Sequence, residues 1–261
     1  MIARLANRGW AWWLADALTL GIVGLWFYST LHLPSYVLPG PVAVGERLLA
    51  LFTDPVFLAH TFASAWRVVA SVIIALVIGT ALAMLHRAVP ALDWVIRVGI
   101  QPFLNSFPSI GWAILAALWF RAGHFSIIFV QVAILIPFCL INVAEGLRQL
   151  DPEAQEMARS FTRDRSRIFF KVTVPLLLPY LLGALRISYG IAWKISLVAE
   201  LLGSTSGLGY LMLQAQGSAD MTTVIATCLA IVILFIAGEK LFIDPLAKHF
   251  ATREAVITAK E

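Results

Sequence analysis

The chain has 261 residues, of which 60% are hydrophobic and 13% are charged, and its mean hydropathy is +0.86. Soluble domains are about 45–50% apolar and about 25% charged, so this composition excludes an ordinary soluble domain and predicts an integral membrane protein. The net charge of +4 does not indicate nucleic-acid binding, because a basic excess in a membrane protein more often reflects positively charged cytoplasmic loops. Cys139 and Cys228 lie in long apolar runs, where a disulfide framework has no basis.

Apolar runs of about 20 residues, the length that crosses a bilayer as a helix, occur at about six places. The predicted fold class is therefore an all-α integral membrane protein with about six transmembrane helices. The first run is longer than the apolar core of a cleaved signal peptide, so we interpret it as a span. Pro102, Pro108 and Pro137 are expected to kink their helices. The expected spans are 12–31, 62–85, 96–119, 125–144, 176–201 and 222–242.

Lysine and arginine residues gather on one side of this six-span arrangement. That side holds Arg4, Arg8, Arg87, Arg148, Arg159, Arg163, Arg165, Arg167, Lys171, Lys248, Arg253 and Lys260. The opposite side has little more than Arg47 and Arg121. Because cytoplasmic loops are enriched in Lys and Arg, we expect both termini and the segment 150–179 to be cytoplasmic.

The segment 150–179 is a charged island between two apolar spans. We predict two short helices in it, because Asp151 and Asp164 are good N-caps and positions 154, 157, 158 and 161 form one apolar stripe. This pattern fits a loop whose apolar faces lie on lipid headgroups. It equally fits a helix that docks into a groove on a partner, with Met157 and Phe161 as anchors.

The island also resembles a known motif. Glu156-Met157-Ala158, then Thr162, then Val172-Thr173-Val174-Pro175 follow the spacing E-A-A-x-x-x-G-x(9)-I-x-L-P of the EAA loop in ABC-importer permease subunits. Met157 replaces the first Ala and Thr162 replaces the Gly, so the family's hinge Gly does not carry over. The resemblance assigns ATPase coupling to Glu156, Met157, Ala158, Arg159, Phe161 and Thr162.

The fifth expected span carries Arg186, Lys194 and Glu200. Ionisable side chains at membrane depth are costly and usually face a protein interior or a water-filled path. Arg186 and Lys194 share one side of the helix, which suits a small anion with a carboxylate or sulfonate group. A structural role, by snorkelling or pairing, is the alternative. The other pathway candidates are Tyr189 and Trp193 in this span and Asn105 and Ser106 in the third.

The last outer segment, 203–217, begins polar and rich in Gly and then becomes apolar. It is either an outer gate or re-entrant element, with Gly207, Gly209 and Tyr210 as candidates, or an ordinary outer loop. Its glycines do not suggest phosphate binding, because no strand precedes them and no catalytic Lys follows.

Further motifs extend the resemblance over about residues 60–250. Val198-Ala199-Glu200 and Gly207-Leu208-Gly209-Tyr210-Leu211 are similar to the fifth-span and outer-loop signature of nitrate, taurine and aliphatic-sulfonate permeases. Trp119-Phe120-Arg121-Ala122-Gly123 resembles WFGxG, with Arg121 in place of the first Gly. The resemblance implies a type I importer permease fold. It divides the chain into a peripheral helix and outer loop (1–59), a five-helix permease core (60–250) with its coupling loop (150–175), and a cytoplasmic tail (251–261).

The resemblance implies a non-catalytic subunit of an ATP-driven importer in the inner cell membrane. No G-x-x-x-x-G-K-[ST] loop occurs, so no cofactor is expected on this chain, and ATP and Mg²⁺ belong to a partner ABC ATPase dimer. The other expected partners are a second copy of this chain, an extracytoplasmic solute-binding protein and the lipid bilayer.

Several alternatives stay open. The implied solute is a small organic or inorganic anion, such as a sulfonate, nitrate or a bicarbonate-like ion, but close relatives also carry heterocyclic vitamin precursors. A carrier or membrane scaffold that needs no ATPase is the second class of function. An enzyme is not expected, because the sequence has neither an H-E-x-x-H nor a G-x-S-x-G pattern.

Overall fold

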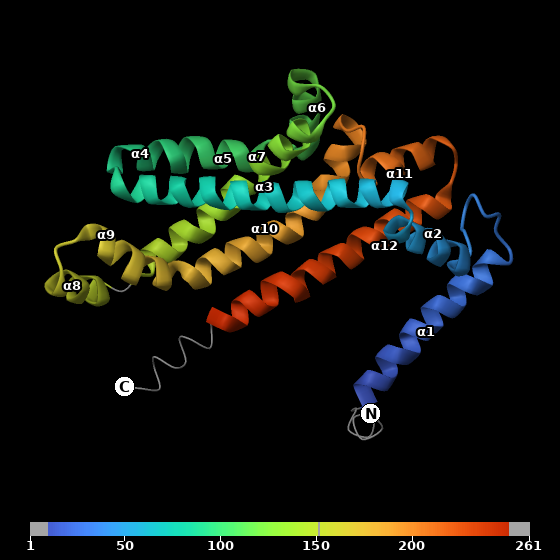
Figure 1. Ribbon diagram of the computed structural model, residues 1–261, viewed down its shortest axis with the longest axis horizontal. Helices are drawn as coiled ribbons and strands as arrows, with labels where there is room; N and C mark the ends of the chain where they lie inside the picture. Colours follow the sequence, from blue (N-terminus) through green and yellow to red (C-terminus); the bar gives the residue numbers. More distant parts are fainter. Residues whose placement is uncertain (1–9, 151, 251–261) are drawn as a thin grey trace. The chain divides into compact units, whose positions relative to one another are not determined.

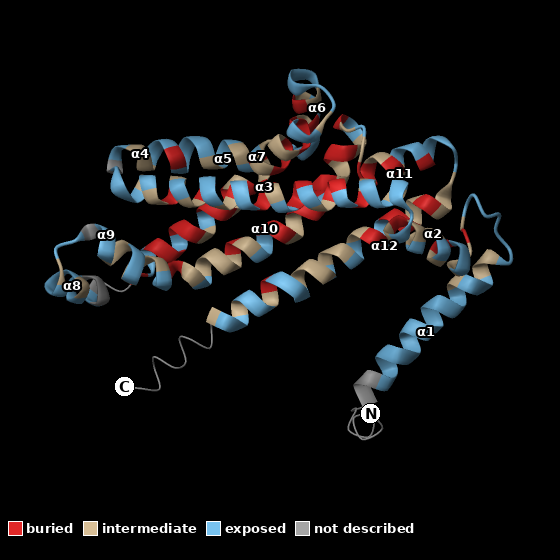
Figure 2. Ribbon diagram, viewed as in Figure 1, coloured by how far each residue is buried: buried red, intermediate tan, exposed pale blue. Residues whose placement is uncertain are grey.

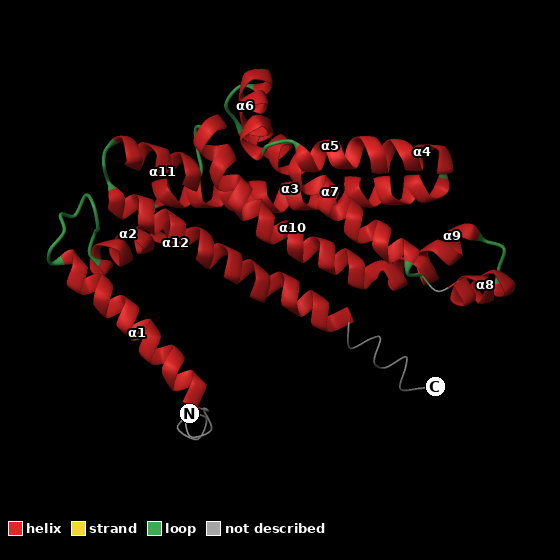
Figure 3. Cartoon of the chain, turned by 180° about the vertical axis from the view of Figure 1, so that it is seen from behind, coloured by secondary structure: helices red, strands yellow, loops and turns green. Residues whose placement is uncertain are grey.

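All of the regular secondary structure in the described residues is helical, as Figure 3 shows. The computed structural model describes residues 10–150 and 152–250. The chain divides into two compact units, which we treat separately. Unit 1 contains Met1–Ala59 and Leu211–Ala230, and unit 2 contains His60–Tyr210 and Ile231–Glu261. The predicted all-α fold is confirmed, whereas the three-part domain division stays a prediction.

Unit 1 includes the first helix of the chain. α1 (Trp10–Thr30) exposes large apolar side chains such as Leu18 and Leu20, which is the pattern of a helix surrounded by lipid. The Trp26 indole N–H donates to the carbonyl of Pro39 at 3.1 Å and so ties α1 to the approach to α2 (Pro41–Thr53). The sequence predicts only an outer loop where α2 lies. The remainder of unit 1 comes from α11 (Leu208–Gly217) and α12 (Met221–Gly238).

Four helices in the described residues are long and apolar enough to cross a membrane. They are Pro55–Ala88, His124–Arg148, Ser166–Gly203 and Met221–Phe250. A bent pair of helices can provide a fifth span. α1 has 21 residues and covers the first expected span, but it is not among the four. Of the about six expected spans, the structure therefore supports four, or five with the bent pair, and the span assigned to α1 stays a prediction.

The third expected span, 96–119, is not one continuous helix. The run Ala91–Ser106 and the helix Ser109–Phe120 meet at 87°. Phe107 between them is extended (ψ 128°), because a residue before proline is disfavoured in the helical region, and Pro108 is the extended N-cap residue of the next helix. Pro108 therefore turns the chain sharply where the sequence predicts a kink. The elements of this region are α4 (Pro90–Trp94), η2 (Val95–Ile100), α5 (Gln101–Ser106) and α6 (Ser109–Phe120).

Three widened helical turns each end two residues before a proline. A proline lacks the N–H of a normal helical bond, and its ring crowds the carbonyl four residues earlier. A turn of π-helix, with bonds to the fifth residue back, accommodates this missing donor. The prolines are Pro102, Pro175 and Pro245, and the preceding π-turns are η2, η3 (Phe169–Thr173) and η4 (Glu239–Ile243).

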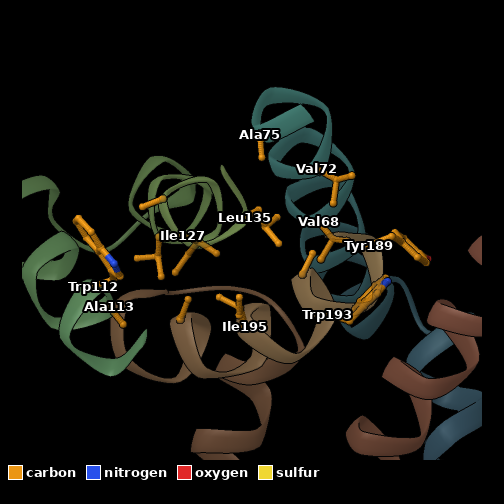
Figure 4. Packing of buried hydrophobic residues seen from close by; sticks show 14 of the residues in the cluster. Val68, Val72, Ala75, Trp112, Ala113, Ile127, Leu135, Tyr189, Trp193 and Ile195 are labelled. Atoms are coloured by element: carbon orange, nitrogen blue, oxygen red, sulfur yellow. The ribbon is translucent and has the colours of Figure 1, made fainter. Parts of the chain in front are cut away.

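The core of unit 2 lies where α3 (Pro55–Ala88), α6, α7 (His124–Arg148) and α10 (Val174–Gly203) pack together (Figure 1). Figure 2 shows the buried residues concentrated on these helices. α3 and α7 approach each other closely at Gly79, where the absence of a side chain leaves the necessary space. A Cβ atom on Gly79 would lie only 2.5 Å from the Cβ of Cys139. Figure 4 labels Val68, Val72, Trp112, Ile127, Leu135, Tyr189, Trp193 and Ile195 among the core residues.

Candidate functional site

The expected pair of short helices is present between α7 and α10. The first, α8 (Pro152–Phe161), is followed by α9 (Arg165–Ile168). Asp164 caps α9, since its Oδ1 accepts hydrogen bonds from the backbone N–H groups of Ser166 at 3.0 Å and Arg167 at 3.2 Å. The expected cap of the first helix, Asp151, lies outside the described residues.

A threonine holds the turn between these helices. The Thr162 hydroxyl accepts a hydrogen bond from the backbone N–H of Asp164 at 3.2 Å, and the Thr162 N–H donates to the carbonyl of Ala158 at 3.3 Å. The position at which the EAA motif has Gly is therefore occupied by a side chain that fixes the turn by hydrogen bonding.

The apolar anchors of α8 are exposed. Met157 is 61% exposed and Phe161 is 82% exposed, while Ala158 is half-buried. Glu156 and Arg159 are also exposed. A cavity of about 410 Å³ runs beside α8, and its walls are Met157, Ala158, Phe161, Thr162, Arg167, Ile168, Lys171, Val172, Pro175 and Leu176. Four of the six coupling candidates thus line this cavity, Glu156 and Arg159 do not, and the assignment of all six to coupling stays a prediction.

Arg186 and Lys194 have different surroundings although both lie on α10. The Arg186 guanidinium contacts two carboxylates, with Nε 2.9 Å from Glu239 Oε1 and a terminal nitrogen 2.5 Å from Asp244 Oδ1. Lys194 is exposed and forms no hydrogen bond or ion pair with any residue that the structure describes. The charge of Arg186 is thus balanced within the chain, and that of Lys194 is not.

The aromatic candidates between these two residues belong to the core. Tyr189 donates its hydroxyl to the carbonyl of Leu234 at 3.0 Å and stacks on the ring of Phe235. Trp193 is 4% exposed and meets Tyr189 edge to face. Both residues are therefore buried by packing within the chain, and their role in the pathway stays a prediction. The other two pathway candidates, Asn105 and Ser106, are exposed at the end of α5, next to the bend.

Glu200 forms a fully buried ion pair with Arg67 of α3. The distance between Arg67 Nη1 and Glu200 Oε1 is 2.8 Å, and the side chains are 0% and 1% exposed. The carboxylate also accepts hydrogen bonds from the Ser64 hydroxyl at 2.8–2.9 Å and from the Gly209 N–H at 3.0 Å. Arg67 donates in turn to the carbonyl and hydroxyl of Ser206 at 2.7 and 2.6 Å. This network fastens the outer segment to α3 and α10.

The candidate glycines of the outer segment make room for this network. Gly207 has φ +114°, and a Cβ atom there would lie 2.4 Å from the Glu200 carboxylate. A Cβ atom on Gly209 would lie 2.7 Å from the carbonyl oxygen of Leu197. The third candidate, Tyr210, stacks on the imidazole of His60 with ring centres 5.8 Å apart.

The sequence interpretation missed Arg67 and its neighbours. Arg67 is an ionisable residue inside the second expected span, so the criterion that identified Glu200 would also have found it. His60 and His124 belong to the same network. In the structure His124 Nδ1 accepts a hydrogen bond from Arg67 Nε at 3.1 Å, and His60 Nδ1 accepts one from the Gly207 N–H at 3.0 Å. No sequence signal indicates these pairings, because the partners are at least 57 residues apart in the chain and meet only through tertiary packing.

These features define a multi-pass helical membrane protein with a short amphipathic helix between two of its spans. In the described residues no group of three or more His, Cys, Asp or Glu residues is placed to hold a metal ion. The chain belongs to the family of binding-protein-dependent transport system inner membrane components, which matches residues 75–253. The predicted resemblance to ABC-importer permeases is confirmed.

Individual proteins show the same likeness. The taurine transport system permease protein TauC of Escherichia coli is 28% identical over 237 residues, which cover 85% of each chain. A probable ABC transporter permease protein of Brucella melitensis is 30% identical over 84% of this chain and 88% of its own. The solved inward-facing MetNI methionine ABC transporter shares the fold with a TM-score of 0.59 and 19% identity, over 74% of this chain and 99% of that chain.

Proposed function

We propose that this chain forms the solute pathway of an ATP-driven importer and that α8 couples it to a separate ATPase. The observation that carries the proposal is the exposed pair Met157 and Phe161 on a helix of only 10 residues. A helix of this length rises about 15 Å and cannot cross a bilayer. Its large apolar side chains are therefore available to a partner, as in other helices that lie in grooves.

The surroundings of α8 support a protein groove as its destination. The cavity beside it is lined mainly by apolar residues, and its two cations, Arg167 and Lys171, suit acidic residues on a partner surface. The chain has no phosphate loop, so ATP and Mg²⁺ belong on the partner. Coupling requires α8 on the cytoplasmic side, the side to which the Lys and Arg distribution assigns it together with both termini.

Lys194 supports a pathway between two copies of the chain. An ammonium group on a membrane-spanning helix is too costly to face lipid, so it faces water or another protein surface. One protomer offers no partner for it among the residues that the structure describes. A homodimer in which the exposed side of α10 faces a shared pathway gives Lys194 a water-filled neighbourhood.

A cation beside the pathway favours a small anion as the solute. Relatives of this chain are named for transport of taurine, nitrate, aliphatic sulfonates and bicarbonate. An extracytoplasmic binding protein would deliver the solute and supply most of the selection. A heterocyclic vitamin precursor is the alternative solute, and a carrier or scaffold without an ATPase is the alternative function.

The test is co-purification from native membranes of the tagged chain and of two matched variants. Phe161→Asp places a charge on the α8 anchor, and Phe170→Asp does the same to a Phe that is 67% exposed in the same loop but outside α8. We expect an ABC ATPase to accompany the wild type and Phe170→Asp and to be lost with Phe161→Asp. Membrane insertion of all three proteins is checked by alkaline extraction.

Equal retention of the ATPase by both variants would contradict docking through α8. Purification of the chain without an ATPase, together with solute movement in vesicles free of ATP, would contradict the importer altogether and favour the carrier.

A further inference from the structure

A second and larger cavity lies at the same end of unit 2. Its volume is about 790 Å³, within the range of about 300–1,000 Å³ of small-molecule sites. The last turn of α3 and the end of α7 form one side, and α8, α9 and the turn between them form the other. Figure 1 shows these elements gathered at one end of unit 2. The cavity combines the ends of membrane spans with the loop between them.

Three cations line the cavity. They are Arg87, Arg159 and Arg163, and none of the other described residues in its lining is Asp or Glu. Arg159 and Arg163 form no ion pair with any residue in the described part of the chain. Their neighbours Arg148 and Arg167 differ, because each lies within 4 Å of a carboxylate, at 3.6 and 3.9 Å. Arg159 and Arg163 therefore bring positive charge to the cavity that no described carboxylate balances.

The third arginine is held in place at the cavity wall. Arg87 donates a hydrogen bond to the carbonyl of Leu147 at the end of α7, so its stem bridges two spans. The rest of the wall is largely apolar and includes Met84, Leu150 and Phe169. A cavity with guanidinium groups and apolar walls matches a ligand that is itself amphiphilic.

The depth of the cavity matches lipid headgroups. α3 has 34 residues, which rise about 51 Å and exceed the roughly 30 Å of the hydrocarbon region. Arg87 lies two residues, or about 3 Å of helix, beyond the end of the expected span 62–85, which corresponds to the level of the headgroups. On the expected orientation this is the cytoplasmic leaflet, where basic pockets between helices bind anionic headgroups.

We propose that this cavity binds the phosphodiester headgroup of an anionic phospholipid, with Arg159 and Arg163 as its main ligands. The shared chemistry is a phosphate anion, and the apolar walls favour a lipid over free phosphate. The proposal goes beyond transport, because it requires only membrane insertion and does not depend on ATPase docking. A lipid seated there would connect the ends of α3 and α7 with the turn that follows α8.

The experiment measures binding of phosphatidylglycerol to the purified full chain by native mass spectrometry. Phosphatidylcholine with the same acyl chains and inorganic phosphate are the other two probes. We expect phosphatidylglycerol to bind most tightly and the Arg159→Gln/Arg163→Gln variant to bind it about 30-fold more weakly. The control variant Arg148→Gln/Arg167→Gln removes the same charge from paired positions and should keep the affinity.

Four outcomes would overturn the proposal. Equal binding of phosphatidylcholine would remove the role of charge, and equal losses in both variants would indicate general surface attraction. Displacement of the lipid by inorganic phosphate at similar concentration would indicate a free-anion site. Displacement by added ATPase would identify that protein as the occupant. Failure of the ATPase to bind at all contradicts the proposed function and leaves the lipid measurement intact.

Discussion

The two ends of unit 2 use the same kinds of residue in opposite ways. At the end that holds the outer segment, Arg67 and Glu200 are buried and each has several hydrogen-bond partners within the chain. At the other end, Arg159 and Arg163 have no ion-pair partner among the described residues, and Phe161 is 82% exposed. At one end the charged groups are paired within the chain, and at the other the described side chains of Arg159, Phe161 and Arg163 remain exposed to solvent.

This difference follows from the cost of burying charge. A buried ion without a partner is so unfavourable that a network such as Arg67–Glu200 persists only when its members are satisfied together. Charged and aromatic groups that remain near water carry no such requirement and stay available for binding. The outer end therefore acts as a brace within the chain, whereas the loop between α7 and α10 keeps exposed charged and aromatic side chains.

The largest expected effect comes from breaking the brace. Arg67→Met leaves the Glu200 carboxylate buried without its cation, and the free energy of unfolding should fall by about 3–5 kcal/mol. Arg47→Met is the control, because Arg47 pairs with Asp220 at 3.6 Å near the surface and its loss should cost less than about 1 kcal/mol. Denaturant unfolding of the purified proteins in detergent measures both.

A double variant sharpens this prediction. Arg67→Met/Glu200→Met removes both charges, so the decrease in its free energy of unfolding should be well below the sum of the decreases in the two single variants. Additive losses would mean that the ion pair is not the unit of stability at this end.

Sequence patterns predict the parts of the structure that depend on local rules. The length of apolar runs predicts the spans of α3, α7, α10 and α12, and the capping position of Asp164 predicts the start of α9. The proline at position 108 predicts a kink. Its size of 87° is not predictable, because it depends on what the two arms pack against. Helix α8 is predicted in the same way, from one apolar stripe, whereas its role in coupling stays a prediction.

Pairings between distant residues escape such patterns. Nothing local indicates that Glu200 meets Arg67, or that Arg186 meets Glu239 and Asp244 while Lys194 meets no described residue. Each pairing depends on the rotation of one helix against another.

The contrast between Lys194 and Arg186 gives an effect of intermediate size. If Lys194 faces the solute, Lys194→Gln should lower uptake of the transported anion about tenfold, because one charge-assisted contact is lost. The same variant should leave the free energy of unfolding unchanged. Arg186→Gln should instead weaken folding, because it leaves the carboxylates of Glu239 and Asp244 without their cation. Uptake into cells, paired with denaturant unfolding, separates the two. The reverse pattern would place Arg186 in the pathway and make Lys194 structural.

The smallest expected effect concerns Asp220, which lies before α12. Asp220 and Arg47 form a partly exposed ion pair, in contrast to the buried pair Arg67–Glu200. Burial alone would raise the pKa of its carboxyl, but hydrogen bonds from Thr223 and the charge of Arg47 hold that pKa below its ordinary value. A lowered pKa stabilises the fold above the unfolded-state value, about 3.9, and this contribution is lost as the pH falls through the folded-state pKa.

Wild type should therefore unfold at a higher temperature than Asp220→Asn at pH 7, and the gap should narrow as the pH falls below about 4. The stabilisation at stake is about 1 kcal/mol or less, since the pair is partly solvated. A gap that stays constant with pH would show that capping by the side-chain oxygen, which Asn retains in part, outweighs the charge. A solvated ion pair would then make no measurable electrostatic contribution to the free energy of unfolding. The difference between the two ends of unit 2 would in that case depend on burial more than on ion pairing as such.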